Sequence, residues 1–312
     1  MRKNFIYILM AGMSLALINA CDINEFPETQ VSTDKFWNTA SDVRMAANYF
    51  YTTLPGLSSS EVEMDVWSSY GYSNSGSGTG ISDGSRVAPV SSTDYNYYSI
   101  FQANSLLEQA PLVIEKGASA EEIAWYMAEA RFFRAFYYFD MFKRFGGVPL
   151  ITKTLSVNDP EVFAERASRE ELFDFILADI DFAIEKLRSA DELDKAKEYG
   201  RISKTGALAF KAKVALFEGT REQFHKYGDA NVHLTIAKEA ARAVIDSKVH
   251  DLFSQATIGA QGERLNNAYF NLFQEAGEGR RNPENIIVKP YGINRENSIV
   301  SAAVQRYYEG NN

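Results

Sequence analysis

The chain has few of the residues on which metal, redox and nucleotide chemistry depend. Its 312 residues include one cysteine and three histidines. One cysteine cannot form a disulfide within the chain, and no HExxH motif or cluster of His and Cys is present to bind zinc. A lysine-bearing phosphate loop and the serine elbow of hydrolases are also missing. We therefore expect no metal site, no cofactor and no catalytic residues.

Positive charge is also scarce. The chain has 32 Lys and Arg against 41 Asp and Glu, a net charge of −9. Residues 1–20 hold two basic and no acidic residues, so the remainder carries 30 basic against 41 acidic residues, a net charge of −11. Such a polyanion repels nucleic-acid phosphates, and no Lys/Arg cluster forms a local exception. We expect no nucleic-acid partner.

The longest apolar run is too short to cross a membrane. Residues 5–18 are uncharged and follow Arg2 and Lys3, whereas a spanning helix needs about 20 apolar residues. A cationic start, an apolar stretch and Ala20 before Cys21 are typical of a secretory signal peptide over residues 1–20.

Cys21 directly follows this segment, and residues 18–21 (INAC) resemble a bacterial lipobox, with Asn19 unusual at its second position. We predict that Cys21 is lipidated with fatty acyl (palmitate) chains and that residues 21–40 form a leader from a membrane anchor. The alternative is an ordinary signal peptide followed by an incidental cysteine.

Apolar residues recur with helical spacing along most of the remaining chain. Helices are predicted over residues 41–54, from about 94 to a kink or break at Pro111, and over 121–144, 168–187, 207–218 and 234–246. Their predicted N-caps are Ser41, Ser119, Ser168 and Ser203. The inward face of the last helix is predicted to hold Ala237, Ala241, Val244 and Ile245.

Alanine-rich faces let helices approach closely, as in tetratricopeptide-like (TPR-like) helical pairs. The fold class is therefore predicted to be mostly α, with TPR-like pairs and long irregular loops in one domain over residues 41–312. One short strand is expected at residues 286–288 (IIV).

A Ser- and Gly-rich segment, residues 57–93, interrupts the helical pattern. A loop of this length within a compact domain is usually functional or disordered. It carries Trp67, Tyr70, Tyr72 and Asn74 within eight residues. Aromatic rings stack on the CH-rich faces of sugars, and Asn bonds sugar hydroxyls, so these four residues are the predicted ligand contacts. The alternative is that the rings only anchor the loop to the helices.

Two arginines, Arg131 and Arg134, lie in the strongly aromatic helix 121–144. They are predicted to be structural, bonded to loop carbonyls or to buried acids such as Asp140, rather than to a ligand. Asp179 and Asp181 are two residues apart on a helix and should point in different directions.

The arginine-bearing helix resembles the signature of the SusD/RagB family. Its sequence AEARFFRAFYYFD (residues 128–140) is followed by FGGVPL (145–150). Further segments agree in order along the chain: 98–108, GRISK (200–204), VIDS (244–247) and NPENII (282–287). The resemblance covers nearly the whole chain after the signal peptide. Family members are usually longer, so the chain looks like an N-terminal portion lacking the C-terminal portion.

This resemblance implies a SusD-like α–α superhelix in a surface glycan-binding lipoprotein of Bacteroidetes. It also implies an outer-membrane location facing the cell exterior and delivery of oligosaccharide to a SusC-like TonB-dependent transporter. The implied protein is a binding protein for nutrient uptake rather than an enzyme. Two alternatives remain open: a helical glycoside hydrolase, since carboxylates are plentiful, and a TPR-like adaptor that binds protein and no sugar.

Overall fold

The structure is a computed structural model of the chain. It describes residues 36–55, 68, 81, 83–87, 90, 92–255, 267–273 and 282–289. The chain divides into two compact units, residues 1–38 and 39–312. Of the first unit, residues 36–38 are described, and the rings of Phe36 and Trp37 meet edge to face, with centroids 4.9 Å apart.

The second unit is helical. Its elements are α3 (Ala40–Thr52), α6 (Tyr98–Glu115), α7 (Ala120–Phe145), the 3-10 helix η2 (Pro160–Phe163), α8 (Arg169–Lys186), α9 (Ala190–Lys195), α10 (Lys204–His225), α11 (Ala230–Asp246) and α12 (Ala268–Leu272). The described residues contain no β-strand. The mostly α prediction is confirmed.

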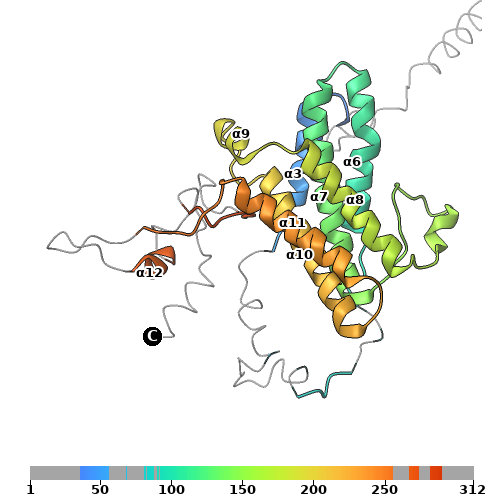
Figure 1. The fold of residues 1–312 in the computed structure, drawn as a ribbon. Coiled ribbons are helices and arrows are strands. Elements are labelled where there is room, and N and C mark those ends of the chain that lie inside the picture. The colour runs from blue at the N-terminus through green and yellow to red at the C-terminus, as the bar shows by residue number, and fades with distance from the viewer. Residues whose placement is uncertain are drawn as a thin grey trace, which may run out of the picture. The chain divides into compact units, whose positions relative to one another are not determined.

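Consecutive helices pack as pairs. Helices α6 and α7 lie side by side, α8 packs against α7, and α10 and α11 form a second pair beside α8 (Figure 1). Helix α7 touches α3, α6 and α8 and so forms the centre of the unit. None of the helices that the structure describes combines the length and hydropathy required to span a bilayer.

Side-chain caps fix where most of these helices begin. The hydroxyls of Ser119, Ser168 and Ser203 accept hydrogen bonds from backbone N–H groups three residues later, as predicted. The first predicted cap was wrong: Thr39, not Ser41, caps α3, because Thr39 and Asp42 form a reciprocal capping box. Helix α6 continues through Pro111 to Glu115 and is not broken there.

The core is built from aromatic rings on α7. Phe133 meets Phe50 of α3 with ring centroids 5.5 Å apart, and Phe132 meets Phe210 of α10 at 5.2 Å. On the α8 side, Phe142 lies 5.8 Å from Phe173. These rings are at most 5% exposed. Helix α7 is therefore buried on several sides by apolar residues that lie around much of its circumference. For this reason α7 is not divided into one polar and one apolar face.

Helix α11 packs on α10 through small residues, although its predicted inward face was partly wrong. A Cβ on Gly219 of α10 would lie 2.9 Å from the backbone nitrogen of Leu234, so glycine permits the close approach. Ala237, Ala240 and Val244 form the buried seam of α11. Ala241 and Ile245 are exposed, because a seam with spacings of three and four residues turns them outward.

The predicted strand at residues 286–288 is absent, because the described residues provide no paired strand there. Residues 282–289 instead pack on the start of α10. A Cβ on Gly206 would lie 3.3 Å from Cγ1 of Ile287 and 3.6 Å from the carbonyl oxygen of Ile286. Lys289 donates to the carbonyl of Leu54, beyond the end of α3, at 2.7 Å.

Candidate functional site

An aromatic groove lies between the start of α6, the chain that follows α7, and η2. Its volume is about 310 Å³, at the lower end of typical ligand pockets. It is lined by Tyr95, Tyr97, Ile100, Phe101, Pro149, Ile151, Lys153, Leu155, Glu161 and Val162. We refer to this surface as the aromatic groove.

Two tyrosines, the buried Tyr138 and the partly buried Tyr97, hold the floor of the aromatic groove in place. The Tyr97 hydroxyl donates to the carbonyl oxygen of Pro149 at 2.7 Å. The Tyr138 hydroxyl of α7 donates to the Ile151 carbonyl and accepts from the Ile151 N–H, both at 2.8 Å. Burial raises the pKa of both phenols well above the usual value, so they remain neutral hydrogen-bond donors across the physiological range.

Asn104 of α6 fixes the next part of the floor. Its side-chain amide donates to the carbonyl oxygens of Ile151 at 3.1 Å and Lys153 at 3.0 Å. Its carbonyl oxygen accepts from Nη1 of Arg134 at 2.8 Å. Arg134 in turn makes two bonds to Asp179, at 2.7 and 2.9 Å. The core network therefore extends to the backbone that lines the groove.

The walls of the groove differ chemically. On one wall, Tyr95 is 40% exposed and Phe101 is 42% exposed. On the other wall, Nζ of Lys153 lies 2.6 Å from Oε1 of Glu161, and both side chains are partly exposed. Apolar ring surface beside charged hydrogen-bonding groups is the arrangement that an amphiphilic, hydroxyl-rich ligand requires.

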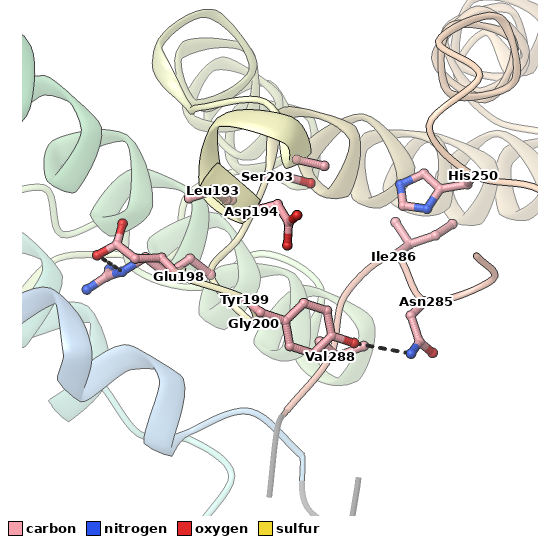
Figure 2. A pocket seen from close by; sticks show the side chains of 12 residues that line it. Leu193, Asp194, Glu198, Tyr199, Gly200, Ser203, His250, Asn285, Ile286 and Val288 are labelled. Atoms are coloured by element: carbon pink, nitrogen blue, oxygen red, sulfur yellow. Dashed lines mark hydrogen bonds and ion pairs between the residues drawn. The ribbon is translucent and has the colours of Figure 1, made fainter. Parts of the chain in front are cut away.

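A second cavity is smaller, and polar side chains that line it are hydrogen-bonded to one another or to neighbouring groups. It measures about 80 Å³, between α9, the start of α10 and residues 282–289, well below the ~300 Å³ of a typical ligand pocket. Figure 2 shows Tyr199 facing Asn285, whose amide donates to the Tyr199 hydroxyl at 3.3 Å. His250 contacts Thr205 at 3.0 Å and the Pro283 carbonyl at 3.3 Å. These hydrogen bonds connect separate segments of the fold, so the cavity between them is structural.

The structure confirms the structural role predicted for Arg134 and corrects its partner. Arg134 binds Asp179, whereas Asp140 is exposed and pairs with Lys143 at 2.7 Å. Arg131 lies over the Phe182 ring at 4.1 Å, with Nη1 3.6 Å from Asp179. Asp179 is buried, and Asp181 pairs with Lys211 on the surface. The two aspartates therefore point in different directions, as predicted.

The predicted ligand contacts Trp67, Tyr70, Tyr72 and Asn74 lie outside the described residues, as does Cys21. They stay predictions. The aromatic groove was not predicted from the sequence. Its available signal was the cluster of Tyr95, Tyr97, Tyr98 and Phe101 in seven residues. The charged wall lies about 50 residues further along the chain, and pairing at that distance is set by tertiary structure. Within the described part of the chain, no three His, Cys, Asp or Glu side chains group to hold a metal.

The described part of the chain is thus a unit of paired helices with an aromatic groove at one end of α6. The sequence model of the SusD-like family, described as "Starch-binding associating with outer membrane", matches residues 30–216. The chain belongs to the SusD-like family, and the resemblance found in the sequence is confirmed.

Relatives agree with this assignment. SusD-like protein P38 of Formosa agariphila is 27% identical over 321 residues, which cover 99% of this chain and 58% of that protein. A SusD-like protein of Bacteroides fragilis superposes with a TM-score of 0.57 at 21% identity, over 86% of this chain and 48% of that one. A laminarin-binding SusD-like protein gives a TM-score of 0.52 at 22% identity, over 78% and 50% of the two chains. The chain thus spans about half the length of these relatives, and the structural matches establish its fold.

Proposed function

We propose that this protein is a cell-surface lipoprotein that binds glycans and passes oligosaccharide to a SusC-like TonB-dependent transporter of the outer membrane. The observation that carries the proposal is the aromatic groove, in a chain of the SusD-like family. The protein acts by binding and does not cleave its ligand. A ligand-binding loop at Trp67, Tyr70, Tyr72 and Asn74 is the second part of the proposed site.

Sugars fit the groove for a physical reason. One face of a pyranose ring carries several C–H groups, which pack on an aromatic ring, while its hydroxyls both donate and accept hydrogen bonds. Phe101 and Tyr95 offer exposed rings, and Lys153 and Glu161 offer donors and acceptors across the groove. A purely apolar ligand would leave the charged wall without partners, and a small ion would leave the rings unused.

Affinity electrophoresis of the full chain against a panel of polysaccharides tests binding directly. We expect retardation by at least one polysaccharide, with no shortening of the polymer after long incubation. Reducing ends that appear with time would instead indicate the glycoside hydrolase. A protein that no polysaccharide retards, yet which co-purifies with a transporter, would be the adaptor.

The loop part of the site has its own test. Trp67→Ala should weaken glycan binding roughly tenfold, since ring stacking contributes about 1–3 kcal/mol and 1.4 kcal/mol corresponds to a factor of ten. Its thermal midpoint should stay near that of the unaltered chain. Lower stability at unchanged affinity would place Trp67 in a structural role.

The anchor and the transporter are tested in cells. Cys21→Ala should move the protein from the membrane fraction to the soluble fraction, because it removes the lipid acceptor. Continued membrane association of this variant, without incorporation of labelled fatty acid, would contradict lipidation. Detergent-solubilised membranes should yield a TonB-dependent transporter together with the tagged chain, and its consistent absence would argue against the delivery role.

A further inference from the structure

Acidic groups outnumber basic groups around the charged wall of the aromatic groove. Lys153 pairs with Glu161, and it also feels the carboxylates of Asp159 and Glu108, which together raise its pKa. Both oxygens of Glu108 are bound by Thr154, at 2.8 Å from the backbone N–H and 2.6 Å from the hydroxyl. Three carboxylates thus act on one ammonium, and of the three Glu161 lines the groove itself.

The opposite side of the groove does not reverse this balance. The positive charge of Arg166 partly offsets the raised pKa of Tyr97. Nη1 of Arg166 donates to the carbonyl oxygens of Phe145 and Gly147, both at 3.3 Å. Arg144 near Tyr95 is paired with Asp94 at 2.7 Å. The surroundings of the groove therefore hold four carboxylates, those of Glu161, Asp159, Glu108 and Asp94. They hold three cations, Lys153, Arg166 and Arg144, so negative charges exceed positive charges by one. An anionic ligand is therefore repelled on the side where its polar groups would lie.

The pair itself is incompletely bonded. Oε2 of Glu161 is shielded from solvent and has no hydrogen-bond partner among the described residues, a costly arrangement for a carboxylate oxygen. Oε1, which faces Lys153, retains acceptor capacity, because each carboxylate oxygen accepts more than one hydrogen bond. The Lys153 ammonium has three N–H donors, of which the ion pair uses one. The pair can thus accept a hydrogen bond from one sugar hydroxyl at Glu161 and donate a hydrogen bond from Lys153 to the next hydroxyl.

We infer that the aromatic groove selects uncharged glycans, with a sugar ring stacked on Phe101 and two neighbouring hydroxyls bound by the Lys153–Glu161 pair. The inference rests on the proposed glycan-binding function and specifies its ligand class. A neutral sugar supplies a donor and an acceptor in adjacent hydroxyls and adds no charge. A uronate or sulfated sugar brings a negative charge next to Glu161, Asp159 and Glu108. These three carboxylates already share the single ammonium of Lys153.

The test measures the affinity of the full chain, in a zwitterionic detergent that carries no sugar, for two neutral and two acidic polysaccharides. Amylopectin and a mixed-linkage β-glucan are the neutral probes, and polygalacturonate and alginate are the acidic probes. We expect the unaltered chain to bind a neutral probe and to bind the acidic probes at least tenfold more weakly at low salt. The difference should narrow as salt is added, because the repulsion acts between exposed charges.

Two variants test the groove itself. Phe101→Ala should weaken neutral binding roughly tenfold through lost stacking, and Lys153→Met should weaken it several-fold. The controls are Phe163→Ala, which removes a ring that is 86% exposed and does not line the groove, and Lys195→Met, which breaks a pair of the same 2.6 Å length on α9. Both controls should bind like the unaltered chain.

A third variant tests the charge. Glu161→Gln keeps an acceptor and removes one negative charge, so binding of the acidic probes should rise several-fold. Glu185→Gln removes the same charge from an exposed residue of α8 and should change nothing. Equal gains in the two variants would show that total charge, and not the groove, excludes acidic glycans.

The outcomes separate this inference from the function beneath it. Polysaccharide binding that Phe101→Ala and Lys153→Met leave unchanged would overturn the inference and leave the glycan-binding function standing. Equal binding of neutral and acidic probes by the unaltered chain would overturn the selectivity. If no polysaccharide binds, neutral or acidic, the proposed function and the inference are both overturned. Circular dichroism of each variant verifies that a lost affinity is not lost folding.

Discussion

Two ion pairs of nearly equal length lie in opposite surroundings. Arg134 meets Asp179 at 2.7 Å with side chains 6% and 2% exposed, and Lys153 meets Glu161 at 2.6 Å with side chains 51% and 42% exposed. The buried pair has its atoms committed, since Asp179 receives two bonds and Arg134 also binds Asn104. The exposed pair retains two N–H donors on Lys153 and further acceptor capacity on Oε1 of Glu161. Burial, and not pairing, therefore distinguishes charges that stabilise the fold from charges that can bind a ligand.

The two pairs are connected. Asn104 accepts from Arg134 on one side and donates to the carbonyl oxygens of Ile151 and Lys153 on the other. Lys153 provides the ammonium of the groove, and its backbone is therefore held in place by the buried network. Loss of the buried pair should disturb the groove, whereas loss of the exposed pair should not disturb the core.

Breaking the buried pair should give the largest effect. Arg134→Met leaves Asp179 buried without its partner and removes a donor from Asn104. We expect a loss of about 3–5 kcal/mol in the free energy of unfolding, which is typical when one member of a buried pair is removed. Urea unfolding followed by circular dichroism measures it.

Two matched variants sharpen this result. Arg131→Met removes a cation that is 34% exposed and 3.6 Å from the same Asp179, so its cost should be clearly smaller. Arg134→Met combined with Asp179→Leu removes both buried charges, and much of the lost stability should return. Equal costs for the two arginines would contradict the distinction by burial.

A second buried pair should respond to pH. Arg201 donates to Glu129 at 2.6 Å, and their side chains are 9% and 2% exposed. Burial raises the pKa of Glu129, while Arg201 opposes that shift. Arg201→Met should therefore raise the pKa of Glu129 further. Near neutral pH we expect a loss of about 3 kcal/mol, at the lower end for a broken buried pair, because a carboxyl with a raised pKa is easier to protonate.

The sign of the pH effect follows from the direction of the shift. A carboxyl whose folded-state pKa exceeds its unfolded value of about 4.3 binds protons more tightly when folded. Its contribution to stability is complete below that value and is lost as pH rises through the folded-state pKa. Arg201→Met should thus be more stable relative to the unaltered chain at pH 5 than at pH 8. Lys195→Met, which breaks an exposed pair with Asp191, is the control, and an equal pH dependence would refute the explanation.

The floor of the groove should give an intermediate effect. Tyr97→Phe removes the hydroxyl that donates to the Pro149 carbonyl and keeps the ring. The net loss should be about 1 kcal/mol, the typical contribution of one hydrogen bond. Thermal unfolding measures it, with Tyr98→Phe, a 57% exposed neighbour, as the control. A Tyr97 variant as stable as its control would show that the floor is held by packing alone.

The sequence predicted local features of this fold better than distant ones. Caps at Ser119, Ser168 and Ser203 were found because a cap and its N–H partner are three residues apart. Thr39 was missed in favour of Ser41, although Asp42 three residues after Thr39 carried the signal. In each case the information lies within one helical turn.

Features that depend on tertiary structure were harder to predict. Arg134 was expected to bind loop carbonyls or a buried acid such as Asp140, six residues away, and its acid partner is Asp179, 45 residues away. Ile245 was expected inside because its helix has several apolar residues around it, and the position of α10 decided which of them are buried. The groove combines Phe101 with Glu161, a juxtaposition that no local pattern encodes.

The smallest effect on stability is expected from the exposed pair. Lys153→Met removes the ammonium from Glu161, but the Glu161 side chain is 42% exposed, so water replaces the lost partner. Exposed pairs contribute little to folding, so the urea midpoint should not change measurably. The Asn104 bond to the Lys153 carbonyl uses only the backbone and survives the substitution. A midpoint lowered as far as in Arg134→Met would show that this pair also holds the fold, and the contrast between the two pairs would be lost.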